Sequence, residues 1–547
     1  MRRDWSVNVE PMAERVRQCL HCGAEADFLD IRAATMRCNY LQDHLTMPLG
    51  PKLSADQLAA NLADIAPRYT EQQALVESSR CLFCFDAPCI TACPTGIDIP
   101  AFIKKIMTGN VTGAARTILT ANILGASCAR VCPTEVLCEG ACVMLDRDSD
   151  PIKIGRLQRY ATDHVYENRI QILQPAAQKS GKRVAIIGGG PAGMGCAAEL
   201  VHLGHDAVIF ERQPEAGGLN TYGIAYYKMK PAVSLEEVEL VKSLGVEFRC
   251  GVEVGTDVTR AELDQYDAVF IGVGLGEGHR LRIPGEDLAQ VVDALRFIEQ
   301  IHTQPLHQIP VGARVAVLGC GNTAIDAATQ ARRLGADEVV VIYRRGEGDM
   351  SAYAFEYDLA KRDGASFLFH HAPVKVLGQN GNVTGLQLVQ TRFNQSGALE
   401  SIEGSEIILP FDMVIKAVGQ QKQSDWLMKL FPELKLNRNG TMGRDFETGQ
   451  TSLRHVFAGG DCANGGREVV NAVGEGKKAA RGMHKMFCEA TVVGPIQPSR
   501  WGVPDGPYGS GLDAPIRVPE LEEKYEQISP ASHPAPAASA LTSTNQE

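Results

Sequence analysis

The sequence predicts an α/β protein in which an α-helical N-terminal domain precedes two parallel α/β domains. Residues 1–165 contain no long stretch of alternating β-branched residues and suggest short helices, such as 54–66 and 99–119, between Cys, Pro and Gly turns. From Lys182 onward, short apolar runs such as RVAIIG, DAVFIGVG and RVAVLG alternate with helical periodicity. Such runs are typical of strands that are buried in parallel sheets.

The composition is that of an ordinary globular protein with several domains. The 547 residues correspond to three or four domains of about 150 residues each. The formal net charge is -11 and no basic block is present, which disfavours nucleic-acid binding because phosphates must be neutralised by clustered Lys and Arg. No apolar stretch approaches the roughly 18 residues of a membrane span, and the start MRRDWSVNVE lacks the apolar core of a secretory signal. We therefore expect a cytoplasmic protein that binds neither nucleic acid nor membrane.

Cysteines are concentrated in the helical domain, at or before Cys142. In an intracellular chain such crowding favours metal or redox sites over disulfides. Two groups stand out, and each contains a Cys-Pro pair, as in the bacterial ferredoxin run, where the fourth cysteine ligates the other cluster. The groups are Cys81-x2-Cys84-x4-Cys89-x3-Cys93-Pro94 and Cys128-x3-Cys132-Pro133-x5-Cys138-x3-Cys142.

Eight thiolates at these spacings predict two [4Fe-4S] clusters, with Cys128 as the eighth ligand on spacing alone. Zinc is the alternative, but structural zinc prefers paired Cys-x2-Cys turns, and only Cys81 and Cys84 form one. A further set of three cysteines is incomplete as a metal site even with two nearby histidines, so a packing role is favoured there. That set comprises Cys19, Cys22 and Cys38, with His21 and His44.

The first glycine-rich turn, in RVAIIGGGPAGMGCAAEL, has the fingerprint of a dinucleotide-binding βαβ unit. Gly188 permits the tight turn, Gly190 lets the backbone approach a pyrophosphate, and Gly193 allows the helix to pack closely on the strand. The next strand ends in Glu211, where a carboxylate would accept hydrogen bonds from a ribose. A later strand ends in a Gly-Gly-Asp turn whose Asp461 suits the ribityl chain of a flavin, or alternatively caps a helix.

The second fingerprint, in RVAVLGCGNTAIDAATQARRL, is Gly319-x-Gly321-x2-Ala324. The strand that follows ends in Arg344 and Arg345 instead of an acid. Arginine at this position suits the 2′-phosphate of NADP(H), whereas a solvated basic strand end is the alternative. We favour a nicotinamide cofactor here.

Taken in order, GGGPAGMGCAAEL, GGLNTYGI, GCGNTAID, YRR and FAGGD resemble the flavin- and NAD(P)H-binding module of glutamate synthase small subunits and dihydropyrimidine dehydrogenases. The cysteine-rich part is closer to the dihydropyrimidine dehydrogenases, as the runs CLFCFDAPCITACPTGIDIP, CARVCPTEVLC and IGRLQRYATD indicate. The CxxCGxPFC motif of glutamate synthase small subunits is absent. The resemblance covers about residues 75–490. It is greatest to the flavin subunit of bacterial dihydropyrimidine dehydrogenases.

The resemblance implies ligands for each cofactor. One [4Fe-4S] cluster would be held by Cys81, Cys84, Cys89 and Cys142, and the other by Cys93, Cys132, Cys138 and, in place of Cys128, Gln158 of the IGRLQ motif. Together with the fingerprint glycines, the FAD positions are Gly188, Gly190, Ala192, Gly193, Glu211, Gly218, Leu219, Lys228, Val254, Gly460, Asp461 and Val469. The NAD(P)H positions are Gly319, Gly321, Asn322, Thr323, Arg344, Arg345, Ala417 and Gly419. Animal relatives that use NADPH carry a further arginine where this chain has Ser351, so the choice between NADH and NADPH stays open.

We therefore expect an iron-sulfur domain (1–165) followed by two Rossmann-like dinucleotide-binding domains. The FAD domain (166–288 and 441–490) would be split around the NAD(P)H domain (289–440), and a disordered tail (491–547) would follow, because it is rich in Pro, Ala, Ser and Thr.

The long dihydropyrimidine dehydrogenases continue into an FMN-binding (β/α)8 barrel, which this chain lacks, so no residue of it is expected to act as the catalytic acid. The expected function is that of an electron-input subunit in a hetero-oligomer. It would oxidise NAD(P)H through FAD and pass electrons through the two clusters to an FMN-containing partner that reduces uracil or thymine. The alternatives are a glutamate synthase-like NADPH oxidoreductase that feeds a large amidotransferase subunit, and a cofactor-bearing scaffold that relays electrons to other acceptors.

Overall fold

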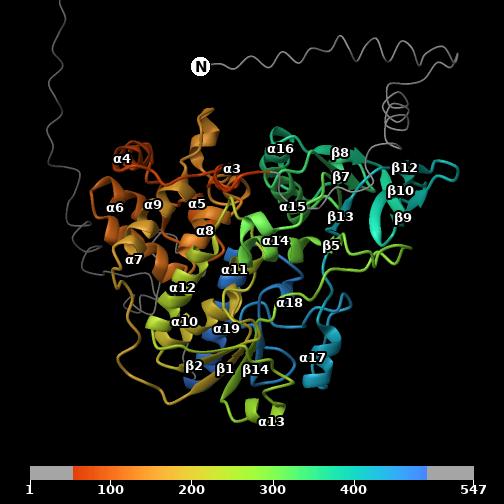
Figure 1. Ribbon diagram of the computed structural model, residues 1–547. Helices are drawn as coiled ribbons and strands as arrows, with labels where there is room; N and C mark the ends of the chain where they lie inside the picture. Colours follow the sequence, from red (N-terminus) through yellow and green to blue (C-terminus); the bar gives the residue numbers. More distant parts are fainter. Residues whose placement is uncertain (1–52, 489–547) are drawn as a thin grey trace, which may run out of the picture.

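The computed structural model describes residues 53–488 (Figure 1). Cys19, Cys22, Cys38 and the predicted tail 491–547 lie outside the described residues. The described chain begins with a helical domain. Its elements are α3 (Ala55–Asn61), α4 (Glu71–Ser79), α5 (Pro88–Thr91), α6 (Ile99–Met107), α7 (Val111–Ala121), α8 (Gly125–Val131), η2 (Thr134–Val136), η3 (Val143–Arg147) and α9 (Ile154–Glu167).

The helix predicted over residues 99–119 is wrong as a single element, because α6 and α7 are separate helices. Gly109 has a φ of +78°, a left-handed conformation that ends the first helix. Asn110 then caps the second, since its side-chain oxygen accepts a hydrogen bond from the Gly113 N–H at 2.9 Å. The helix predicted over 54–66 is also shorter than expected, with Ser54 as its N-cap and Asn61 as its last residue.

The first sheet is parallel, with the strand order β14-β4-β1-β2-β3. Val184 of β1 pairs with Ala207 of β2 and Ala268 of β4, and Val269 of β4 pairs with Val456 of β14. A strand from near the C-terminal end of the described chain therefore completes a sheet that starts about 270 residues earlier (Figure 1). The strands are β1 (Arg183–Ile187), β2 (Asp206–Glu211), β3 (Glu247–Cys250), β4 (Ala268–Ile271) and β14 (Val456–Ala458), and the helices are α10 (Pro191–His202), α11 (Leu219–Tyr222), α12 (Pro231–Ser243), α13 (Arg260–Leu263), α18 (Asp461–Asn464) and α19 (Val469–Cys488).

The second sheet is also parallel and is inserted into the first domain, with the order β5-β13-β6-β7-β8. Beside it lies an antiparallel sheet in which β10 pairs with β9, β11 and β12. The strands are β5 (Val291–Asp293), β6 (Arg314–Leu318), β7 (Glu338–Tyr343), β8 (Ser366–Phe369), β9 (His371–Gln379), β10 (Asn382–Phe393), β11 (Leu399–Ser401), β12 (Ile407–Leu409) and β13 (Met413–Lys416), and the helical elements are α14 (Ala294–Thr303), η4 (Leu306–Gln308), α15 (Asn322–Arg333), η5 (Glu347–Asp349) and α16 (Ala354–Arg362).

The return to the first domain comes earlier than the predicted boundary at residue 440. Helix α17 (Ser424–Leu430) lies inside the segment 289–440, yet Leu427 and Leu430 are buried in the core of the first sheet, with Ala185 and Val208. The apolar side chains of α17 thus belong to the first domain, and the second ends between β13 and α17.

Helix α19 joins the helical domain to the first sheet. One continuous apolar core contains Phe102 and Leu157 from the helical domain, Val184 from β1, and Val473 from α19. Polar contacts reinforce it, since Lys477 of α19 donates from Nζ to the Ala121 carbonyl at 2.8 Å. Among the described residues, no helix combines the length and apolar character that a membrane span requires. The α/β class with an N-terminal helical domain and two Rossmann-type domains is confirmed.

Candidate functional site

The first four predicted thiols surround one apolar cavity, here named the first cavity. Phe83 has a positive φ of 50°, and the turn it makes brings Cys81 and Cys84 to the same cavity. The pKa of Cys89 is raised to about 12, mainly by burial and also by the neighbouring thiols of Cys81 and Cys142. Thiols packed so closely do not ionise readily by themselves, but positively charged iron bound between them would stabilise their thiolates. The donor set therefore fits an iron-sulfur cluster. The lining includes Cys81, Cys84, Cys89, Cys142, Ile99, Ile103, Ile152 and Ile154.

The other predicted ligands line a second cavity. Here the chain offers one donor too many, because both Cys128 and Gln158 reach the cavity beside Cys93, Cys132 and Cys138. The Cys128 thiol hydrogen-bonds that of Cys132, and this contact together with burial raises the pKa of Cys132 well above its usual range. The structure therefore brings both candidate fourth ligands, Gln158 and Cys128, to the same cavity.

The amide of Gln158 is oriented by a backbone contact. Its Nε2 donates to the Gly125 carbonyl at 2.7 Å, which leaves the side-chain oxygen as the group available to the second cavity. Asn122 lies on the same wall, and its buried Nδ2 has no hydrogen-bond partner among the described residues. A donor left in this way suits a cluster sulfur, because buried donors are normally paired. The residues around the second cavity thus fit a cluster as well.

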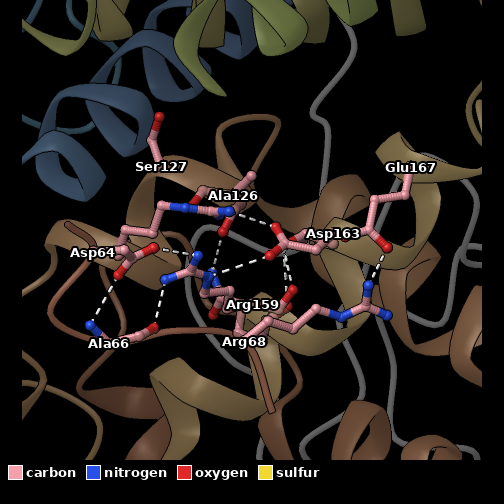
Figure 2. Close-up of polar contacts among 12 residues, drawn as sticks. Asp64, Ala66, Arg68, Ala126, Ser127, Arg159, Asp163 and Glu167 are labelled. Carbon is pink, nitrogen blue, oxygen red and sulfur yellow. Dashed lines mark hydrogen bonds and ion pairs between the residues drawn. The ribbon is translucent and has the colours of Figure 1, made fainter. Parts of the chain in front are cut away.

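An ion-pair network fixes the two helices that carry the rival ligands (Figure 2). Asp163 of α9 accepts from Arg130 of α8 at 2.6 Å and from Arg159 of α9 at 3.2 Å. Arg159 also pairs with Asp64 at 2.5 Å. Burial alone would raise the pKa of Asp64, but the contact with Arg159 lowers it below its usual value. Because Arg159 follows Gln158 directly, the network holds this part of α9 against α8.

The first dinucleotide fingerprint forms the turn between β1 and α10. Gly188 has a φ of +101°, and a Cβ on Gly193 would lie only 2.0 Å from the Gly188 carbonyl oxygen, so the close approach needs glycine. Gly190 is the N-cap of α10, as a pyrophosphate site requires. Glu211 is buried, and its carboxylate accepts from the Gly189 N–H at 2.8 Å, so that its side chain closes the turn.

The other predicted flavin positions gather opposite this turn. A Cβ on Gly460 would meet that of Ala192 at 2.9 Å, and one on Gly218 would meet the Cα of Gly190 at 2.9 Å. Asp461 does not cap α18, whose N-cap is Gly460; its carboxylate instead accepts from the Arg467 N–H at 3.2 Å, and burial raises its pKa. Leu219 is exposed at the start of α11, and Val469 is the first residue of α19.

Two predicted flavin residues are placed differently. The Nζ of Lys228 forms ion pairs with Asp326 at 2.6 Å and Glu356 at 2.5 Å, so it ties the first domain to α15 and α16 of the second. The side chain of Val254 is buried in the core of the first domain, which leaves only its backbone for a ligand.

The second fingerprint opens into a cleft of about 610 Å³, within the range of small-molecule sites. Six of the eight predicted positions line it: Gly319, Gly321, Thr323, Arg344, Ala417 and Gly419. Asn322 instead accepts from the Tyr353 N–H at 3.1 Å, and Arg345 is exposed beyond the cleft lining. Ser351 lines the cleft, where a Cβ on Gly321 would lie 3.2 Å from its Oγ. The sequence alone missed the lining residues His279, Arg280, His371 and Lys416, because they lie outside any fingerprint.

The sites converge at the start of α19. Val470, the second residue of this helix, lines the second cavity, and a Cβ on Gly474 would meet the Pro94 carbonyl oxygen at 2.8 Å. From the second domain, the hydroxyl of Tyr353 donates to Glu468 at 2.6 Å, and burial together with this contact raises the pKa of Tyr353. The predicted flavin end of α19 therefore adjoins both the second cavity and the inserted domain.

Two family models match the chain. Residues 58–170 match the model described as dihydropyrimidine dehydrogenase domain II, 4Fe-4S cluster, and residues 182–476 match that of pyridine nucleotide-disulphide oxidoreductases.

Curated relatives match most of the chain. The chain is 36% identical over 442 residues to the glutamate synthase [NADPH] small chain of Escherichia coli (strain K12), covering 77% of this chain and 93% of the relative. It is 35% identical over 430 residues to the NAD-dependent dihydropyrimidine dehydrogenase subunit PreT of Salmonella typhimurium, covering 78% and 98% respectively. Among solved structures, Mycobacterium tuberculosis FprA in complex with NADPH matches with a TM-score of 0.45 and 22% identity, over 56% of this chain and 84% of that one.

Proposed function

Because the chain belongs to the pyridine nucleotide-disulphide oxidoreductase family and carries a 4Fe-4S domain of the dihydropyrimidine dehydrogenase type, we propose that it is the electron-input subunit of a pyrimidine-reducing enzyme. It oxidises NAD(P)H with FAD and passes the electrons through two [4Fe-4S] clusters. The acceptor is an FMN-containing partner that reduces the C5=C6 bond of uracil or thymine.

One observation carries this proposal: α19 is shared between the predicted flavin site and the second cavity. Val469 begins the helix, and the next residue, Val470, lines the second cavity with Cys93, Cys132 and Cys138. A helix common to both sites supports electron transfer between them.

When bound, FAD supplies the hydride acceptor and the clusters supply one-electron carriers. The chain's own residues bind and orient these groups. Thr323 and Arg344 line the cleft where the nicotinamide cofactor would lie, and the N-terminus of α15 favours its phosphates. Lys228 holds the two dinucleotide domains together through Asp326 and Glu356. Isoleucines of α6 and α9 exclude water from the first cavity.

Two sets of ligands compete only at the second cluster. Gln158 is the ligand that we propose, because Gly125 binds its Nε2 and leaves its oxygen available at the second cavity. Cys128 would then remain a thiol beside the cluster.

The test is isolation of the native protein with its co-purifying partner, followed by NAD(P)H oxidation assays with uracil. Uracil-dependent oxidation is expected only when the partner is present, whereas reduction of an artificial dye needs this chain alone. Dye reduction without any response to uracil or thymine would overturn the pyrimidine assignment and leave the electron-input role.

A second candidate rests on the similarity to the glutamate synthase small chain, which matches this chain about as well as PreT does. The same preparation, given glutamine and 2-oxoglutarate in place of uracil, separates the two. Oxidation that depends on these substrates would identify an amidotransferase partner.

A further inference from the structure

Three metal-binding side chains meet at the far end of α19, away from every site described above. His484 and Cys488 lie one helical turn apart on α19, and His205 approaches them from the turn between α10 and β2. The ligand atoms of all three lie within 4.8 Å of one another. We name this group the His-His-Cys cluster.

The inner histidine is held in a fixed orientation. Ser180 Oγ lies 2.6 Å from His205 Nδ1, and the Ser180 oxygen also accepts from the Lys182 N–H at 3.1 Å. His205 Nε2 is thereby turned toward His484, whose Nδ1 lies 2.8 Å away. A metal-binding histidine is usually oriented in this way by a hydrogen bond to its second ring nitrogen.

A hydrogen-bonded pair of histidines would account for two of these residues but not for the thiol. His205 is fully buried and its ring packs edge-on against Phe487, with the ring centroids 5.1 Å apart. His484 is half-buried and Cys488 is exposed, so the cluster has a closed inner side and an open outer side. Water can occupy that open position.

We propose that His205, His484 and Cys488 bind a zinc ion. Two nitrogens and one thiolate are ligands that Zn²⁺ accepts in a tetrahedral site, with water as the fourth. At Zn–N distances of about 2.0–2.1 Å, two tetrahedral nitrogens lie about 3.3 Å apart, so the two rings need to separate by only about half an ångström.

The position of the zinc site defines its role. β2 runs from Asp206, beside the cluster, to Glu211 at the dinucleotide turn, a distance of about 17 Å at about 3.3 Å per residue. The zinc ion is therefore too far away to take part in hydride or electron transfer. It fastens the last turn of α19 to the start of β2, which are 279 residues apart in the chain.

The test uses the full-length protein, loaded with ZnSO4 and freed of unbound metal by gel filtration. Zinc, iron and flavin are then counted by mass spectrometry and absorbance. The wild type is expected to retain about one zinc per chain. Cys488→Ser is the decisive variant, because this exposed residue can change without disturbing the core, and it should lower zinc affinity at least tenfold with iron and flavin unchanged. Ser180→Ala should weaken affinity about 10-fold through the orientation of His205.

His307→Ala, at an exposed histidine outside the cluster, is the matched control and should keep the wild-type zinc affinity. Zinc X-ray absorption should show two nitrogens and one sulfur. Zinc that is retained equally by Cys488→Ser, or that shows four sulfurs, would be lodged in the cysteine cavities and would overturn the proposal. Binding at millimolar zinc only would overturn it too.

Discussion

Gln158 donates its side-chain N–H to the Gly125 carbonyl at 2.7 Å. This contact orients the amide at a cavity where a thiol, Cys128, competes for the same role. If the proposed ligand is correct, Gln158→Ala should change the EPR signal of one cluster while flavin reduction by NAD(P)H stays intact. Cys128→Ala is the matched variant and should leave both unchanged. The reverse pattern would assign the cluster to Cys128.

Gln158→Cys should lower the midpoint potential of that cluster, because a thiolate adds a negative ligand charge and disfavours the reduced state. Potentiometric EPR titration of the variant and the wild type measures the difference. An unchanged potential would mean that this side chain does not bind the iron.

The Arg130–Asp163–Arg159 network should matter for stability. All three side chains are largely buried, so Asp163→Asn would leave two arginines without their shared carboxylate. We expect a loss of about 3 kcal/mol in the apparent free energy of unfolding, measured by urea denaturation with cluster absorbance as the signal. Asp358→Asn, which breaks an exposed pair with Lys361, should cost less than about 1 kcal/mol. Equal losses of unfolding free energy in the two variants would show that the buried network contributes no more to stability than an exposed ion pair.

Glu237 should make stability depend on pH. Burial raises its pKa from the ordinary value of 4.5 to about 7, although hydrogen bonds from Ser127 and Ala126 act in the opposite direction. The pKa of Glu237 is higher in the folded than in the unfolded protein, so its protonation stabilises the fold. This contribution to the free energy of unfolding is complete below about pH 4.5 and is lost as the pH rises through about 7. Glu237→Gln should remove this slope from thermal unfolding measured between pH 5 and pH 7.5. The control, Glu239→Gln, changes an exposed residue of the same helix and should retain the slope.

Coenzyme preference should respond to Ser351, which lines the cleft beside Arg344. Ser351→Arg adds a charged donor for the 2′-phosphate and should raise the ratio of kcat/KM for NADPH over NADH about tenfold. Ser351→Ala should leave the ratio nearly unchanged, while Arg344→Ala should lower it. Steady-state dye reduction with both coenzymes measures all three.

The dinucleotide turn should tolerate no side chain at Gly193. A Cβ there would lie 2.0 Å from the Gly188 carbonyl oxygen, so Gly193→Ala must open the turn. We expect loss of most bound flavin with the iron content unchanged, measured by absorbance and metal analysis. Gly348→Ala, which has no atom within 4 Å of its added Cβ, should keep its flavin.

The sequence predicted the local features of this molecule well. Both glycine-rich turns depend on residues a few positions apart, so Gly188 and Gly319 could be assigned directly. The cysteine spacing indicated eight thiols in two runs, but the structure places Cys142 of the second run at the first cavity and Cys93 of the first run at the second cavity, as the family resemblance implied. The sequence does contain a signal for the break between α6 and α7, because Gly109 takes a left-handed conformation and Asn110 caps the next helix. The prediction missed it because the apolar periodicity continues across both residues.

Features that depend on distant residues could not be predicted. Lys228 matched a flavin position, but its ion pairs with Asp326 and Glu356 arise only when two domains meet. Lys416 and His279 reach the cleft proposed for the nicotinamide cofactor from strand ends and loops that carry no motif. The position of α17 was missed for the same reason, because its apolar residues fit either core and only tertiary packing decides between them.

The core that runs from Phe102 through Val184 to Val473 limits how such proteins can be assembled from parts. A flavoprotein made by deleting everything before β1 would leave apolar faces of α10 and α19 in water, and would aggregate unless those faces were rewritten. The inserted second domain has one core of its own, between its parallel and antiparallel sheets. Its other core also holds Leu58 and Leu62 of α3 and Tyr227 of the first domain, so its exchange would expose apolar side chains as well. Gene fusion and domain shuffling in this lineage should therefore have carried the cysteine-rich helices and the first parallel sheet as one inherited unit.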